Sequence, residues 1–263
     1  MKNFRLHGNP PYTAAIIHGG PGALGSVAAI ARRLAAMGFG VIEPLQTRDT
    51  VAGLIDELHE TIMQNAQIPT VLIGHSWGAW LAWLYTAAHP AQVKKLILVG
   101  SGPFEASYTP AIETARKARL SPEQAAEWDA IFAALANPQA TDHDSWLKRL
   151  GNLPDTDDYE PITIETDAED CKQFDSAAYQ NIWPEAARLR ASGGLLAMAK
   201  KIRCPVTAIH GDYDPHPAQG VRLPLASRLD DFRFYLLPRC GHSPWKERFA
   251  MEEFYRIIAG EMG

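Results

Sequence analysis

The sequence predicts an α/β fold, in which a mostly parallel, doubly wound sheet carries an inserted and mainly helical cap. Short apolar runs alternate with amphipathic, helix-like stretches along both ends of the chain, as in domains built from strand–helix–strand units. One of these runs leads through a Gly-x-Ser-x-Gly pentapeptide directly into a helix-like stretch. The alternation fails between about residues 104 and 190, which indicates an insertion into the regular sheet.

Most of the expected strands are rich in Val, Ile and Leu, which is typical of strands buried on both faces of a parallel sheet. The helix expected at 50–64 places Val51, Leu54 and Leu58 on one apolar stripe that can cover such a sheet. Strand–helix–strand connections of this kind cross over with a right hand. We expect strands at 14–18, 41–44, 70–74, 95–100, 206–211 and 232–237, and helices at 27–37, 50–64, 79–88, 218–229 and 245–258.

The interrupted stretch also differs in charge from the rest of the chain. Residues 104–190 carry 17 Asp and Glu against 8 Lys and Arg, whereas the net charge of the whole chain is −5. The segment 152–175 is denser still, with nine carboxylates against Lys172 alone. We therefore expect an α/β core formed by residues 1–103 and 190–263, with an acidic cap inserted at 104–189.

Composition excludes several classes of protein. With 46% hydrophobic and 21% charged residues, the chain is typical of a soluble globular protein, and its net negative charge argues against a nucleic-acid partner. No apolar run approaches the roughly 20 residues that span a bilayer, so no membrane partner is expected, and no signal peptide is evident. Cys171, Cys204 and Cys240 are scattered, which favours reduced thiols in a cytoplasmic protein. No metal-binding motif is present, and neither a metal nor a cofactor is expected.

The pentapeptide Gly74-His75-Ser76-Trp77-Gly78 has the context of a nucleophile elbow, because it lies between a buried strand and a helix. A reactive serine must stand clear of its neighbours on a sharp, strained turn. Gly74 and Gly78 remove side chains where that turn brings backbones together. Ser76 is therefore the candidate nucleophile.

A serine hydroxyl needs a general base, and the base needs an orienting carboxylate. His242 follows the last expected strand, on a loop from which it can reach back over the sheet. The turn Gly211-Asp212-Tyr213-Asp214-Pro215 follows the strand before it, and Asp214 is favoured because it projects past the strand tip, whereas Asp212 suits local backbone bonds. His210 and His216, which flank this turn, are expected to be structural.

A tetrahedral intermediate also needs backbone N–H groups that are already aimed at its developing negative charge. The glycine-rich turn His18-Gly19-Gly20-Pro21-Gly22 follows the first expected strand and leaves such groups accessible. Gly20 N–H is the first candidate donor, and Trp77 N–H, directly after the nucleophile, is the second. No Gly-Lys-Ser/Thr sequence follows the turn, so a phosphate-binding loop is disfavoured.

Taken together, His-Gly-Gly-Pro-Gly, Gly-His-Ser-Trp-Gly, Gly-Asp-Tyr-Asp and Cys-Gly-His resemble the α/β-hydrolase superfamily in kind, order and spacing. The resemblance covers residues 13–103 and 190–263. It implies the α/β-hydrolase fold, a catalytic triad of Ser76, Asp214 and His242, and a cap between the sixth and seventh core strands.

Within the superfamily, the first two motifs are most similar to the prolyl iminopeptidase branch, which removes N-terminal proline and whose cap holds the substrate's free amine with acidic groups. Two features depart from that branch: the stretch 43–50 lacks its glycines, and His75 stands where a glycine is common. The chain also leaves little room for the leading pair of strands. We therefore expect carboxylic-ester hydrolysis of a small-molecule substrate, with a prolyl iminopeptidase-like aminopeptidase as the alternative.

Two further readings remain open, because a fold does not determine function. A ligand-binding, receptor-like protein can share this fold, and an acyltransferase would share every motif and differ only in excluding water. The sequence leaves the oligomeric state, the acyl group and the leaving group open.

Overall fold

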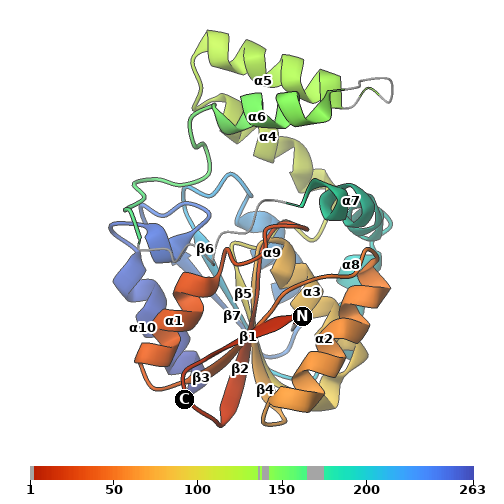
Figure 1. Cartoon of the computed structure of the whole chain (residues 1–263), viewed down its shortest axis with the longest axis vertical. Helices are drawn as coiled ribbons and strands as arrows, with labels where there is room; N and C mark the ends of the chain where they lie inside the picture. The colour runs from red at the N-terminus through yellow and green to blue at the C-terminus, as the bar shows by residue number, and fades with distance from the viewer. Residues whose placement is uncertain (1–2, 136, 138–141, 165–174) are drawn as a thin grey trace.

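The structure, a computed structural model, describes residues 3–135, 137, 142–164 and 175–263 (Figure 1). Cys171 lies outside the described residues, whereas Cys204 and Cys240 are both free thiols. Among the helices that the structure describes, none combines the length and the apolar character that a membrane crossing requires.

One seven-stranded sheet forms the centre of the molecule, in the order β1-β3-β2-β4-β5-β6-β7. All neighbouring strands run parallel except β1, which pairs antiparallel with β3 at the edge. The strands are β1 (Phe4–His7), β2 (Tyr12–Ile17), β3 (Gly40–Pro44), β4 (Thr70–His75), β5 (Val93–Val99), β6 (Val206–Gly211) and β7 (Phe232–Leu237). The central strands are buried on both faces, as their aliphatic composition predicts.

Helices cover the sheet on both sides (Figure 1). On one face, α1 (Ala28–Ala36) and α10 (Met251–Met262) bury Ile30, Leu34, Phe254 and Ile258 against the sheet. The second face is covered by α2 (Val51–Asn65), α3 (Trp77–Ala88), α8 (Gly194–Ala197) and α9 (Gln219–Ala226). Single turns of 3-10 helix lie at Pro90–Gln92, Ala106–Tyr108, Met198–Lys201 and Pro244–Lys246.

A helical insertion separates β5 from β6, the fifth and sixth strands of this chain, whereas the resemblance implied a cap between the sixth and seventh. It contains α4 (Thr109–Lys117), α5 (Pro122–Leu135), α6 (His143–Gly151) and α7 (Ser176–Ala191). The first three helices project beyond one end of the core, and α7 returns to lie beside α2 and α8 (Figure 1). Ile182 and Ala186 of α7 belong to the hydrophobic cluster that α2, α3, α8 and α9 form on the second face of the sheet. This packing anchors α7 to the core more firmly than the projecting helices.

The sequence expectations miss the edge strand β1. Its residues Phe4-Arg5-Leu6-His7 are too few and too polar to signal a strand on their own. Their position depends on a partner in β3, because His7 Nε2 lies 2.8 Å and Arg5 3.5 Å from the fully buried carboxylate of Glu43. A single leading strand therefore occupies the short N-terminal stretch.

The last helix begins later than its apolar pattern predicts, at Met251 rather than near Trp245. The carboxylate of Glu247, which is buried, accepts N–H bonds from Gly241 at 2.6 Å, Tyr159 at 2.6 Å and Glu160 at 2.8 Å. These bonds hold the 3-10 turn at Pro244–Lys246 and the residues up to the start of α10 against the insertion. A helical pattern in the sequence cannot reveal them.

Candidate active site

Ser76 occupies a strained turn between β4 and α3. Its backbone angles, φ 55° and ψ −118°, lie in a region that residues with a side chain rarely adopt. A Cβ atom on Gly74 would lie 2.2 Å from the carbonyl oxygen of Gly78, and one on Gly78 would lie 2.3 Å from that of Ile17. Only glycine therefore fits at both positions, and the turn presents Ser76 to the pocket above the strands.

The two expected oxyanion donors line the same pocket. Gly20 and Trp77 line one pocket together with Ser76. Trp77 is the first residue of α3, so its N–H has no acceptor within the helix and lies at the positive end of the helix dipole. The arrangement offers this N–H to an anion that forms beside Ser76.

Gln46 joins the oxyanion turn to the elbow, a role that the sequence did not reveal. Its side-chain amide donates to the carbonyl oxygen of His18 at 3.2 Å, and its oxygen accepts the indole N–H of Trp77 at 2.8 Å. Gln46 lies in the stretch that departs from the prolyl iminopeptidase pattern. Its polar side chain therefore takes part in holding the relative position of the two expected oxyanion donors.

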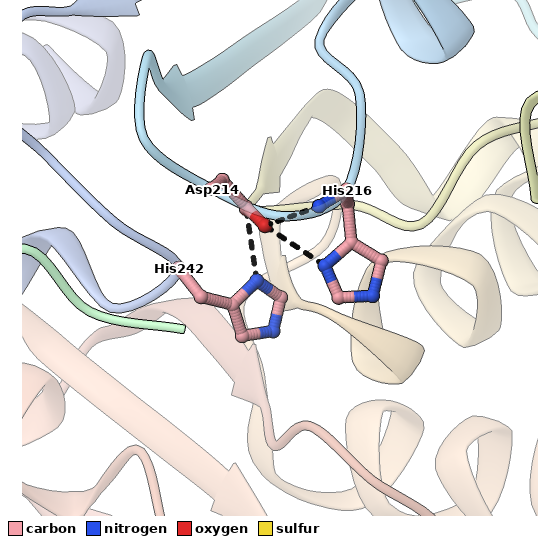
Figure 2. Close-up of side chains that lie close together, drawn as sticks. All are labelled: Asp214, His216 and His242. Atoms are coloured by element: carbon pink, nitrogen blue, oxygen red, sulfur yellow. Dashed lines mark hydrogen bonds and ion pairs between the residues drawn. The ribbon is translucent and has the colours of Figure 1, made fainter. Parts of the chain in front are cut away.

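His242 and Asp214 form a direct hydrogen bond. His242 Nδ1 lies 2.9 Å from Asp214 Oδ2, and both side chains are buried (Figure 2). Because Nδ1 donates its proton to this carboxylate, the lone pair of the neutral ring lies on Nε2. Asp212, the rejected candidate, instead accepts the backbone N–H of Cys240 at 3.2 Å.

His216 is a second histidine on the same carboxylate. Its ring Nδ1 and its backbone N–H both lie 2.8 Å from Asp214 Oδ1 (Figure 2). The rings of His216 and His242 are 4.6 Å apart, and both line the pocket that holds Ser76. The sequence predicted a structural role for His216 but not its contact with Asp214; its place directly after the Asp-Pro turn was the available signal.

These contacts set the charges of the three groups. Burial alone would raise the pKa of Asp214, but the nearby His242, His210 and His216 hold it well below its usual range. Burial opposes the charged form of His242, yet the Asp214 charge and hydrogen bond outweigh it and raise the His242 pKa above the ordinary 6.5. Burial lowers the pKa of His216 despite Asp214, so His216 is the neutral member of the pair.

Ligand atoms of Asp214, His216 and His242 lie within 4.8 Å of one another, close enough in principle to hold a metal ion. Both histidines use Nδ1 on the carboxylate itself, however, so the three groups are already satisfied by one another. The chemistry that this arrangement favours is proton transfer at His242 Nε2 rather than metal binding.

Residues of the insertion hold the histidine loop. The backbone N–H of His242 donates to the carbonyl oxygen of Asp157 at 2.9 Å, and that of Ser243 donates to the side chain of Asp158 at 2.8 Å. Asp158 also pairs with Lys246 at 3.0 Å. The described part of the acidic segment thus has partners within the protein. Residues 165–174 of that segment lie outside the described residues.

The pocket above Ser76 has a volume of about 710 Å³ and a mainly apolar lining. That size suits a small organic ligand. The insertion supplies aromatic side chains to its wall, including Trp128 and Trp183, and α3 supplies Trp80. The lining residues that the following sections use are Ser76, Trp80, Thr109, Arg116, Asp157, Trp183, Arg190, His216 and His242.

The three residues expected to act together come from three connections of the sheet: Ser76 from the turn between β4 and α3, Asp214 from the loop after β6, and His242 from the loop after β7. Asp214 contacts His242 directly, and His242 shares the pocket with Ser76. Sequence reasoning missed Gln46, Arg116, Asp157 and Arg190, because each depends on contacts between distant segments.

Comparison with known proteins agrees with this architecture. Residues 6–256 match the model of the alpha/beta hydrolase family. A pimeloyl-[acyl-carrier protein] methyl ester esterase of Chromobacterium violaceum is 26% identical over 206 residues, which is 78% of this chain and 74% of that protein.

Two solved structures extend the likeness over nearly the whole chain. VinJ superimposes with a TM-score of 0.71 at 17% identity, covering 98% of this chain and 93% of VinJ. A proline iminopeptidase of Mycobacterium smegmatis superimposes with a TM-score of 0.66 at 19% identity, with the same coverage. At such low identity these structures establish the fold alone. With the family model spanning almost the entire sequence, the chain belongs to the alpha/beta hydrolase family.

Proposed function

We propose that this protein is a serine hydrolase that cleaves small carboxylic esters through an acyl-enzyme intermediate. The observation that carries the proposal is the position of Ser76 on a strained elbow, in the same pocket as His242, whose Nδ1 is held 2.9 Å from Asp214. The methyl ester esterase of C. violaceum adds support from a relative whose name states ester cleavage.

The first half of the reaction acylates the serine. His242 Nε2 takes the Ser76 hydroxyl proton as Oγ attacks the ester carbonyl carbon. The N–H groups of Gly20 and Trp77 bind the resulting oxyanion. Asp214 stabilises the imidazolium ring that has just formed. His242 then gives the proton to the alkoxide oxygen as its bond to carbon breaks, and the alcohol leaves.

The second half removes the acyl group. Water gives a proton to His242 Nε2 and attacks the acyl carbon, and the same two N–H groups bind the second oxyanion. When this intermediate collapses, Ser76 Oγ regains the proton and the acid departs. These steps need a nucleophile, an oriented histidine base and two backbone donors, the roles that we assign to Ser76, His242 and the N–H groups of Gly20 and Trp77.

Charge in the pocket disfavours the aminopeptidase alternative. A free amine at the N-terminus of a peptide needs an unpaired carboxylate, as the prolyl iminopeptidase branch provides. Of the described carboxylates in the pocket wall, Asp157 is paired with Arg116 and Glu113 with Lys117. Arg190, which is buried in the same wall, would repel an ammonium group.

Cys240 does not compete with Ser76 as a nucleophile. Its side chain is fully buried, and burial followed by the charge of Glu247 raises the pKa of the thiol far above its usual range. The thiolate that nucleophilic attack requires is therefore disfavoured.

The test compares p-nitrophenyl butyrate with proline β-naphthylamide as substrates for the wild-type protein and for Ser76→Ala. We expect the ester to be turned over, and the substitution to lower kcat by at least about a thousandfold while leaving the melting temperature unchanged. Ester turnover that survives Ser76→Ala would refute the assignment. Preference for the proline amide would establish the aminopeptidase instead.

A fluorophosphonate probe separates the remaining alternatives. Labelling of Ser76 without turnover of any ester would favour a receptor-like protein. Turnover that is faster with an added alcohol than with water alone would favour an acyltransferase.

A further inference from the structure

Arg190 is a buried cation without a counter-charge. It lies near the end of α7 with only 9% of its surface exposed. Among residues 3–135, 137, 142–164 and 175–263, its side chain makes no hydrogen bond and no ion pair, and its buried Nε has no acceptor. Burial lowers the pKa of its guanidinium, and no nearby charge offsets that effect. Burying an unpaired charge destabilises a protein, so this arrangement calls for a reason.

Two tryptophans hold the guanidinium in place. The rings of Trp80 and Trp183 are stacked at 6.0 Å with an angle of 4° between their planes. Arg190 Cζ lies 5.2 Å from the centroid of Trp80 and 5.9 Å from that of Trp183. Such cation–π contacts stabilise the charge but accept none of its directed hydrogen bonds. The N–H groups of the guanidinium are therefore free for a ligand.

The other charges of the pocket are already compensated. Arg116 donates twice to Asp157, at 2.7 Å for each bond, which neutralises the second arginine of the wall. Glu113 pairs with Lys117 at 2.8 Å, and the same ammonium group also pairs with Asp129. Arg190 is thus the uncompensated cation among the described lining residues, and its part of the pocket favours an anion.

A second polar group of the same wall lacks a partner. The hydroxyl of Thr109, at the start of α4, is buried and makes no hydrogen bond within the described part of the chain. It lines the pocket together with Arg190. Two unsatisfied polar groups in one wall are what a polar ligand group would satisfy.

We propose that Arg190 binds a carboxylate carried by the substrate, so that the preferred esters are anionic rather than neutral. A planar carboxylate matches the in-plane N–H pairs of a guanidinium. The inference rests on the proposed ester hydrolysis and specifies the chemical class of its substrate. The carboxylate can belong to the acyl chain or to the alcohol, and the experiment below has an arm for each.

The acyl arm compares p-nitrophenyl hydrogen succinate, glutarate, adipate and suberate with the same compounds methylated at the free carboxyl. The alcohol arm compares the butyrate ester of 4-hydroxybenzoic acid with that of methyl 4-hydroxybenzoate. We expect the ratio of kcat/KM between the anionic and the neutral member to be at least about tenfold in one arm, as a hydrogen-bonded charge pair provides.

In Arg190→Gln this ratio should fall to about one, and in Arg190→Lys it should take an intermediate value, because lysine keeps the charge but not the planar fork. Arg188→Gln is the matched control: it removes the same charge from an exposed position on the same helix and should keep the wild-type ratio. A ratio near one in wild type in both arms, or an unchanged ratio in Arg190→Gln, would overturn the proposal.

Binding provides a readout that does not depend on turnover. In Ser76→Ala, monomethyl adipate should quench the intrinsic tryptophan fluorescence, to which Trp80 and Trp183 contribute, at lower concentration than dimethyl adipate, and Arg190→Gln should remove the difference. If neutral esters are hydrolysed but neither assay shows a preference for the anion, this inference fails while the proposed function stands. If no ester is hydrolysed but the anion binds through Arg190, the proposed function fails while the anion site at Arg190 stands.

The melting temperature distinguishes a binding role from a structural one. Because Arg190 has no counter-charge among the described residues, Arg190→Gln should not lower it. A marked loss would show that the cation–π contacts are structural. The kcat/KM ratio between anionic and neutral esters in Arg190→Lys would then be decisive: an intermediate ratio would support binding by Arg190, and an unchanged ratio would overturn it.

Discussion

His75 Nε2 lies 3.1 Å from the backbone carbonyl oxygen of His242, so the residue before the candidate nucleophile holds the loop of the candidate base. The ring of His75 also contacts the ring of His242, with centroids 4.7 Å apart, and meets the edge of Trp245. Burial, followed by the charge of His242, lowers the His75 pKa well below 6.5. His75 therefore stays neutral and donates from Nε2, which connects the loops of the candidate nucleophile and the candidate base without adding a charge.

The first prediction concerns the pH profile of the wild-type protein. His242 must be neutral to accept the Ser76 proton, and its pKa lies above 6.5 because Asp214 outweighs the effect of burial. Ester kcat/KM should therefore fall as pH is lowered through a value above 6.5. His75 and His216, with lowered pKa values, cannot produce this limb. A limb below 6.5 in the measured profile would contradict the assignment.

Replacing His216 should shift that limb. In His216→Phe, Asp214 Oδ1 loses the ring donor at 2.8 Å and keeps only the backbone N–H. The carboxylate then shares less of its charge and stabilises protonated His242 more strongly. We expect the limb to move to higher pH and the maximal kcat/KM to fall about tenfold. His89→Phe, which changes a histidine outside the pocket lining, should leave both values unchanged.

The two members of the Arg116–Asp157 pair should shift the pKa of His242 in opposite directions. Asp157 raises and Arg116 lowers the pKa of His242. Arg116→Gln should therefore move the acid limb to higher pH, and Asp157→Asn should move it to lower pH. The double variant should return close to the wild-type profile. Shifts of the same sign in both single variants would show that the effect arises from folding rather than charge, which melting temperatures would verify.

Gly74→Ala should prevent correct folding of the elbow. The new methyl group would lie 2.2 Å from a backbone oxygen of Gly78, which cannot move without disturbing α3. We expect a loss of more than about 3 kcal/mol in the free energy of unfolding, measured by urea denaturation. Gly260→Ala is the control, because its Cβ would meet open space in α10 and should stabilise the helix by up to about 1 kcal/mol. Equal stability of the two variants would argue against a tight elbow.

Much of the architecture could be predicted from the chain itself. Buried parallel strands carry a local signal, because burial on both faces selects Val, Ile and Leu, and the expected strand at 206–211 matches β6. The elbow carries one too, since the clash at Gly74 and Gly78 allows only glycine. The edge strand β1 lacks such a signal, because its place depends on the buried carboxylate of Glu43.

The tertiary structure decided what surrounds Ser76. Sequence order alone suggested Asp214 and His242 as its partners, but the second histidine on Asp214 depends on how the turn after β6 folds. The same holds for Arg190, which looks like an ordinary charge at the end of a helix. Only packing against Trp80 and Trp183 makes it a buried cation in the pocket. Strands and sharp turns are specified by neighbouring residues, whereas burial and charge compensation are set by segments that meet only in the folded chain.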